Sequence, residues 1–179
     1  MVRSKADQAT EKGTTIPDTE FQHIPWAPEL DSGSVCGIPV TFNTHKEWKG
    51  KKIVVVSIPG AYTPICHQQH IPPLVKRVDE LKAKGVDAVY VIASNDPYVM
   101  GAWGVYNNAK DSVIFATDVD LAFSKALGAT IDLSFKKMGE RTARYALIID
   151  DLKIVDFASD EGDTGALQNA SIDTILTKV

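Results

Sequence analysis

Cysteine is scarce in this chain, whose 179 residues include only Cys36 and Cys66. Two cysteines in a chain of this size do not form a disulfide scaffold, which favours a reducing compartment and redox-active thiols. Long apolar runs are missing as well: no stretch approaches the roughly 20 residues of a membrane span, and the N-terminus lacks the apolar segment of a secretion signal. The sequence therefore argues against a membrane protein and against a secreted disulfide-rich domain.

Runs of basic residues are also missing. Lys and Arg total 19 against 23 Asp and Glu, a formal net charge of −4 that argues against nonspecific nucleic-acid binding. What is present, 44% hydrophobic and 23% charged residues, is ordinary for a globular protein. We expect one domain over residues 16–179, preceded by a polar, disordered segment over residues 1–15.

Strands and helices are predicted to alternate before a final hairpin and helix. Residues 20–48 and 129–142 are expected to be irregular, Pro72-Pro73 should kink the first long helix, and Asp150-Asp151 should form the hairpin turn. The pattern predicts strands at 52–58, 88–93, 113–116, 144–149 and 153–157, and helices at 64–84, 97–107, 121–127 and 165–178. This order predicts an α/β fold with a mixed central sheet flanked by helices on both faces.

The most informative segment is PGAYTPIC, residues 59–66, which follows the apolar run at 53–56. Thr63 is an allowed N-cap and Pro64 a favoured first helical residue, which places Cys66 in the first turn of a helix. Unpaired N–H groups and the positive end of the helix dipole favour a thiolate there. The alternative is a buried structural cysteine that behaves as a small hydrophobe.

Pro59-x-x-x-Thr63-x-x-Cys66 resembles the active-site signature of the peroxiredoxins, thiol peroxidases that reduce hydroperoxides. The wider stretch PGAYTPICHQQHIP is similar to the group that contains peroxiredoxin-5, the plant type II enzymes and the fungal alkyl hydroperoxide reductases. The similarity continues through residues 91–103, 115–128 and 144–149, and covers roughly residues 20–179. It implies a thioredoxin-like fold and a peroxidase that needs no cofactor or metal.

A thiolate alone does not make a fast peroxidase. Lowering a cysteine pKa from about 8.5 to ~6 raises the thiolate fraction roughly 30-fold, but the accompanying loss of nucleophilicity takes back about tenfold. The site must therefore also stabilise charge on the departing oxygen. We expect the Thr63 hydroxyl both to donate to and to accept from the peroxide, and Pro59, which has no N–H, to shield the thiol.

Two further residues leave alternatives open. On spacing alone Arg144 reads as a solvated charge at a strand end, no better placed than Arg141 or Lys137; the resemblance implies that Arg144 is the active-site arginine. His70 lies one helical turn after Cys66 and is predicted either to lend positive charge to the thiolate or simply to pack.

A sulfenic acid formed at Cys66 must be resolved by a thiol. The human and plant relatives have their resolving cysteine near the position of residues 164–168, where this chain has none. Resemblance to the fungal branch implies instead a Cys36–Cys66 disulfide between subunits of a homodimer, although sequence separation alone leaves an intramolecular bond open. The resemblance also implies hydroperoxide substrates and an external dithiol reductant such as thioredoxin.

Competing functions are a metal-binding module, a dithiol oxidoreductase and a peroxide-sensing redox relay. The module would use Cys66, His67 and His70, but the first two are adjacent and diverge by about 100° around a helix. The oxidoreductase is disfavoured because Thr63-x-x-Cys66 stands in place of Cys-x-x-Cys. The relay would differ from a detoxifying enzyme in its partner rather than in its site.

Two predictions concern the surroundings of the protein. Either a dimer contact near the site or core packing would account for the aromatic residues Trp103, Tyr106 and Tyr62. The C-terminal residues 177–179, Thr-Lys-Val, match the Ser-Lys-Leu peroxisomal address poorly, so we expect a cytoplasmic location.

Overall fold

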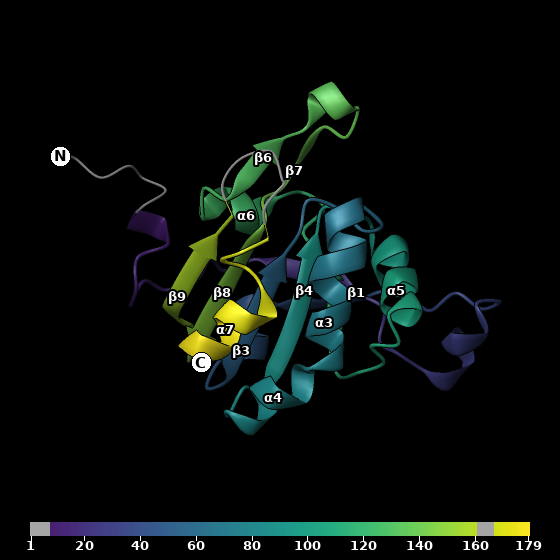
Figure 1. The fold of residues 1–179 in the computed structure, drawn as a ribbon, viewed down its shortest axis with the longest axis horizontal. Coiled ribbons are helices and arrows are strands. Elements are labelled where there is room, and N and C mark those ends of the chain that lie inside the picture. Colours follow the sequence, from purple (N-terminus) through teal and green to yellow (C-terminus); the bar gives the residue numbers. More distant parts are fainter. Residues whose placement is uncertain (1–7, 161–166) are drawn as a thin grey trace.

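The computed structural model describes residues 8–160 and 167–179, and a seven-stranded sheet lies at its centre (Figure 1). Its order is β2-β1-β5-β4-β3-β8-β9; β3, β4 and β5 pair in parallel and the outer strands pair antiparallel. The predicted mixed sheet is thus confirmed. Its strands are β1 (Glu20–His23), β2 (Val40–Asn43), β3 (Lys52–Ser57), β4 (Ala88–Ala93), β5 (Ile114–Thr117), β8 (Tyr145–Asp150) and β9 (Lys153–Ser159).

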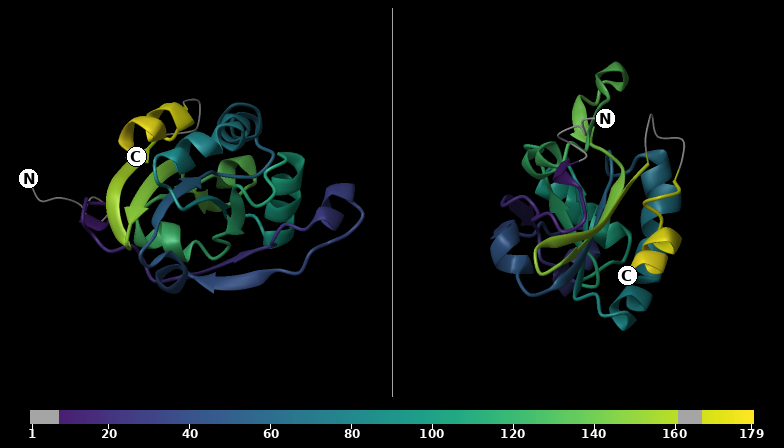
Figure 2. Two further views of the ribbon diagram at one scale, coloured as in Figure 1. Left: turned by 90° about the horizontal axis from the view of Figure 1, so that it is seen from below. Right: turned by 90° about the vertical axis from the view of Figure 1, so that its left-hand side faces the viewer.

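Helices cover both faces of this sheet (Figure 2). Along β3, Val54 and Val56 pack into the core of one face, whereas Ile53 and Val55 pack into the core of the other. A strand buried on both sides needs apolar residues throughout, which explains the continuous apolar run. The first face carries α3 (Ile71–Lys76), α4 (Val78–Ala83), α5 (Pro97–Tyr106) and α7 (Ile172–Lys178); the second carries α2 (Thr44–Trp48) and α6 (Ala122–Ala126).

The helix predicted over residues 64–84 is less regular than expected. A π-helical turn, η2, spans Cys66–His70, and α3 and α4 follow with a break at Arg77. The N–H of Ile71 donates to the carbonyl of Cys66, the wide hydrogen bond of a π turn. Pro72-Pro73 have no N–H groups for the carbonyls that precede them, so the predicted interruption is confirmed but takes the form of a widened turn just before the prolines.

Two segments predicted to be irregular contain strands, so both predictions are wrong. Residues 20–48 supply β1 and β2 and the short helix η1 (Pro28–Ser32). Residues 129–142 form a separate hairpin that projects from the sheet, with η3 at its tip (Figure 1). These strands are too short for an apolar alternation to be recognised, and pairing with neighbours forms them. The hairpin consists of β6 (Thr130–Asp132), η3 (Ser134–Lys136) and β7 (Glu140–Thr142).

The C-terminal elements are confirmed with shifted ends. Asp150 pairs with Lys153, so the two-residue turn is formed by Asp151 and Leu152, both at positive φ, one residue later than predicted. The last helix, α7, begins after its N-cap Ser171 rather than at residue 165, which lies outside the described residues.

The predicted disordered segment 1–15 is tied to the sheet at its end. Residues 1–7 lie outside the described part of the chain, but the N–H of Gly13 donates to the carbonyl of Ile154 and the N–H of Ile154 donates to the carbonyl of Thr14. Residues 13 and 14 therefore lie along β9, and for them the prediction of disorder is wrong.

Candidate active site

Cys66 lies where β3 gives way to a helix. After Ser57 the chain turns through Pro59-Gly60, passes Tyr62 at a φ of 60°, and becomes helical at Pro64. The thiol is fully buried. Its predicted place in the first helical turn is confirmed, although that turn is π-helical from Cys66 onward.

Side chains fix the turn over the thiol. Thr63 Oγ1 donates to the carbonyl of Gly60 at 2.8 Å, and Asn95 Oδ1 accepts the N–H of Ala61 at 2.9 Å. Because its proton is engaged, the Thr63 hydroxyl offers lone pairs, rather than the predicted donor and acceptor together, to a ligand in this state. Pro59 is buried in the same turn and presents no N–H.

Arg144 is brought directly to Cys66. Its Nη1 lies 3.5 Å from Cys66 Sγ, and the side chain is 4% exposed. The solvated strand-end alternative is therefore wrong for Arg144. Its Nε is buried and has no hydrogen-bond partner among the described residues.

Strand pairing explains how a residue so far along the chain reaches the thiol. Ser57, the last residue of β3, pairs with Tyr145, the first residue of β8. Arg144 therefore lies beside the turn that leads from β3 to Cys66. Arg141 instead donates from Nε to the carbonyl of Met138, within the β6–β7 hairpin.

His70 holds Arg144 and carries no charge. Arg144 Nη1 donates to His70 Nδ1 at 2.9 Å, so the proton of the neutral ring is on Nε2, which donates to the carbonyl of Ala170 at 2.8 Å. Burial, with a further contribution from Arg144, lowers the pKa of His70 to about 4. The predicted role of lending positive charge to the thiolate is therefore wrong. The ring does pack in the core, as the other prediction has it, but it also accepts from Arg144 and donates to Ala170.

Sequence reasoning missed Asp160. Its N–H donates to the carbonyl of Arg144 at 3.0 Å, and its carboxylate accepts the N–H groups of Gln168, Asn169 and Ala170. This carboxylate thus fixes the turn whose Ala170 carbonyl accepts from His70. Asp160 follows β9 and belongs to no motif, and the strand predicted over residues 153–157 ended too early to bring it opposite Arg144.

A cavity of about 210 Å³ opens over the turn and reaches Arg144. Its lining is mostly apolar, and its polar side chains are those of Thr63, Lys136 and Arg144. The β6–β7 hairpin, absent from the sequence prediction, supplies one wall. The lining residues are Pro59, Thr63, Pro64, Ile65, Leu133, Lys136, Met138 and Arg144.

Cys36 is not brought to Cys66. Both are free thiols; Cys36 is exposed and lies between η1 and β2. The segment that contains it projects beyond α5, on the side of α5 opposite α3 (Figures 1 and 2).

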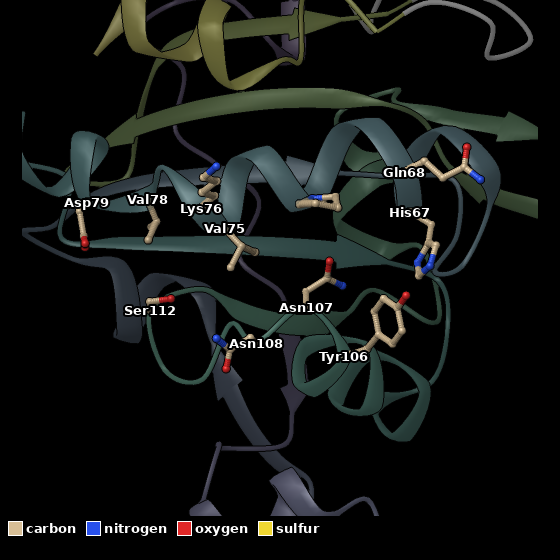
Figure 3. A pocket seen from close by; sticks show the side chains of 11 residues that line it. His67, Gln68, Val75, Lys76, Val78, Asp79, Tyr106, Asn107, Asn108 and Ser112 are labelled. Atoms are coloured by element: carbon tan, nitrogen blue, oxygen red, sulfur yellow. The ribbon is translucent and has the colours of Figure 1, made fainter.

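A larger hollow of about 890 Å³ lies between α3 and the end of α5, and contains neither cysteine (Figure 3). His67 and Tyr106 lie close together at one end of it. Trp103 Nε1 donates to His67 Nδ1 at 2.9 Å, and Trp103 itself is fully buried. Of the aromatic residues discussed above, Trp103 therefore belongs to the core, whereas Tyr62 and Tyr106 are exposed.

Three of the four imidazole nitrogens of the proposed metal ligands, His67 and His70, bond to protein groups. His67 Nδ1 accepts from Trp103, and both nitrogens of His70 bond to protein groups. In residues 8–160 and 167–179 no three His, Cys, Asp or Glu side chains are grouped as metal ligands would be. Over the same residues, no helix has the length and apolar character needed to cross a bilayer.

Comparison with known proteins gives concordant matches. The model of the family described as Redoxin matches residues 11–176. A Malassezia furfur protein named "Putative peroxiredoxin" is 84% identical over 171 residues, 96% of this chain and 97% of the relative. A Lipomyces kononenkoae protein named "Putative peroxisomal peroxiredoxin" is 39% identical, covering 89% of this chain and 94% of the relative. The crystal structure of reduced Prx3 in complex with H2O2 from Vibrio vulnificus is 32% identical with a TM-score of 0.80, covering 93% of this chain and 97% of that one.

Proposed function

Because the chain belongs to the redoxin family and is a peroxiredoxin, a peroxidase that works through a cysteine thiol, we propose that Cys66 is its peroxidatic nucleophile. The observation that carries this proposal is the 3.5 Å approach of Arg144 Nη1 to Cys66 Sγ in a buried site. Arg144 is a permanent cation with a donor at hydrogen-bond distance from the sulfur. Cys36, exposed on a projecting loop, has no comparable environment in the described residues.

In the proposed first step the Cys66 thiolate attacks one oxygen of a hydroperoxide. An S–O bond forms, the O–O bond breaks, and the departing oxygen takes a proton, leaving a sulfenic acid and water or an alcohol. Arg144, which lines the cavity, stabilises the charge that develops on the oxygens. Thr63 accepts a hydrogen bond from the protonated oxygen, and Pro59 shields the thiol.

The cavity supports organic hydroperoxides as well as hydrogen peroxide as substrates. Leu133, Met138 and Ile65 offer apolar surface in the cavity that Arg144 also lines. An alkyl group would remove this apolar surface from water, whereas hydrogen peroxide has no apolar group to cover it.

In the second step we propose that the Cys36 thiolate attacks the sulfur of the Cys66 sulfenic acid on a second copy of the chain. An S–S bond forms, the S–O bond breaks, and the oxygen leaves as water. The loop of Cys36 projects away from α3 of its own chain (Figure 2), and a disulfide requires Cα atoms within about 7 Å. Apolar side chains flank Cys36, with exposed fractions of 51% for Val35, 83% for Ile38 and 41% for Val40, which suits a contact with another copy.

The cycle closes when an external dithiol of the thioredoxin type reduces this disulfide, and the proposed setting is the cytoplasm of a cell. The name of one relative places that relative in the peroxisome. A peroxide-sensing relay would use the same residues with another protein as the oxidised partner.

A non-reducing denaturing gel of the reduced protein after one equivalent of hydrogen peroxide tests both steps. We expect a disulfide-linked dimer in the wild type and in neither Cys66→Ser nor Cys36→Ser. A monomer with an internal bridge would contradict the intersubunit route, and an unchanged pattern in Cys36→Ser would contradict the resolving role.

A further inference from the structure

The residue beside Cys36 is packed against the body of the molecule although Cys36 itself is exposed. Gly37 is partly buried, and a Cβ at this position would overlap Cγ2 of Ile24. The φ of Gly37 is not positive, so the backbone conformation does not demand a glycine. The close approach of Ile24 does.

Ile24 is held from its other side by a second glycine. In α5, a Cβ at position 101 would lie 3.2 Å from both Cβ and Cδ1 of Ile24. A glycine inside a helix is destabilising relative to alanine, so its presence here needs a packing reason. Ile24 thus lies between Gly37 of the loop and Gly101 of the helix, and connects the backbone next to Cys36 to α5.

A second contact ties the base of the loop to the same region. Trp26 Nε1 donates to Asp31 Oδ1 at 2.8 Å, and Lys110 Nζ lies 5.5 Å from the centre of the Trp26 ring. Between the loop and α5 there is also a cavity of about 320 Å³. A cavity therefore adjoins the loop, and of the side-chain atoms around Gly37 the Cγ2 of Ile24 makes the closest approach.

We propose that Ile24, seated between Gly37 and Gly101, is a positioning residue for Cys36 and sets the rate of disulfide formation. This inference rests on the proposed function, in which the Cys36 thiolate attacks the sulfenic acid of Cys66. Before Cys36 attacks it, the Cys66 sulfenate can react with a second hydroperoxide to give a sulfinate and water or an alcohol. A displaced Cys36 therefore slows the second step and increases the sulfinate yield, and leaves the first step unchanged.

The test separates the two steps in the full-length protein. Stopped-flow mixing of reduced protein with hydrogen peroxide gives the rate of Cys66 oxidation, quenched samples on non-reducing gels give the rate of disulfide formation, and intact mass gives the sulfinate fraction. For Gly37→Ala we expect disulfide formation to slow by about ten- to a hundredfold, because a displacement of about 1 Å can have an effect of that size. Cys66 oxidation should stay within about twofold of wild type, since no catalytic contact changes.

Three variants keep the test specific. Ile24→Val retains Cγ2 and should behave as wild type, whereas Ile24→Ala should slow disulfide formation. In the double variant, Gly37→Ala should add no further slowing, because the atom that it would meet is gone. Leu176→Ala on α7 removes the same number of carbons from another partly buried side chain and should leave disulfide formation unchanged.

A wild-type rate of disulfide formation in Gly37→Ala would overturn the inference. It would also be overturned if the double variant formed the disulfide more slowly than Ile24→Ala alone, by the factor seen for Gly37→Ala alone. Equal slowing of both steps would overturn it too, because that would mean a general loss of structure. Slowing that disappears at high protein concentration would do the same, because association rather than loop position would then have changed. If Cys36→Ser still forms the wild-type disulfide, the proposed function itself fails, and that result is distinguishable from all of these.

Discussion

The guanidinium of Arg144 has two neighbours that limit how it can act. Nη1 lies near both Cys66 Sγ and His70 Nδ1, whereas Nε has no partner among the described residues. A neutral His70 can accept from Arg144, but a protonated ring would present a second donor and a like charge. The neutral ring therefore holds the guanidinium beside the sulfur by accepting its hydrogen bond, and it adds no second positive charge.

Replacing Arg144 tests this arrangement at its centre. We expect Arg144→Gln to lower the second-order rate constant for hydrogen peroxide by about 100-fold, as loss of a preorganised donor at a developing oxyanion does. Competition kinetics against a second peroxidase measures it. Lys137→Gln, which removes an exposed charge from the hairpin, should stay near wild type; a comparable loss there would contradict the assignment to Arg144.

The pKa of His70 predicts a pH-dependent stability. Because burial lowers its pKa from 6.5 to about 4, the unfolded chain binds more protons between these values. The stabilisation is complete above about pH 6.5 and is lost as the pH falls towards 4, a loss of up to about 3 kcal/mol. Urea unfolding of the wild type at several pH values should show a steeper loss below pH 6.5 than His70→Gln. Equal slopes would show that His70 is not the titrating group.

At the scale of the element, the π turn η2 contains Cys66 and is the segment that must unwind before the proposed disulfide can form. Cys66 is buried, so the proposed disulfide requires residues around it to leave the helix. The π turn has widened hydrogen bonds, and Pro72-Pro73 supply no N–H groups to close it. We infer that unwinding stops at these prolines, where α3 begins.

Hydrogen exchange tests this unwinding. In the disulfide-bonded protein we expect lower amide protection over residues 64–71 than in the reduced protein, with unchanged protection in α4 as an internal control. Equal protection of residues 64–71 in both states would refute it.

The β6–β7 hairpin is the element that sets the apolar part of the cavity. We expect Met138→Ala to lower kcat/KM for an organic hydroperoxide such as cumene hydroperoxide by about three- to tenfold, the effect of a small apolar contact. Hydrogen peroxide should be affected less than twofold, because it does not reach the apolar wall. Phe135→Ala, at the exposed tip of the hairpin, is the matched control. Equal losses for both peroxides would show that the wall does not select between them.

At the scale of the whole molecule, a feature can be predicted from the sequence when the residues that determine it are close together along the chain. Cys66 and Thr63 follow from a local strand–turn–helix pattern and lie at the predicted start of the helix, although the Thr63 hydroxyl donates to the carbonyl of Gly60 instead of capping the helix. Arg144 needs the β3–β8 register, which only resemblance could provide. The short strands and Asp160 were missed because pairing with distant segments, rather than local pattern, determines them.

The central claim is that Sγ of Cys66 is the atom that peroxide oxidises first. The most direct measurement is the rate at which Cys36→Ser and Cys66→Ser react with one equivalent of hydrogen peroxide, with a sulfenic-acid trap and peptide mass spectrometry to locate the adduct. We predict that Cys36→Ser reacts at the wild-type rate with the adduct on Cys66, and that Cys66→Ser reacts only as slowly as a free thiol. Rapid oxidation of Cys36 in the absence of Cys66 would contradict the account.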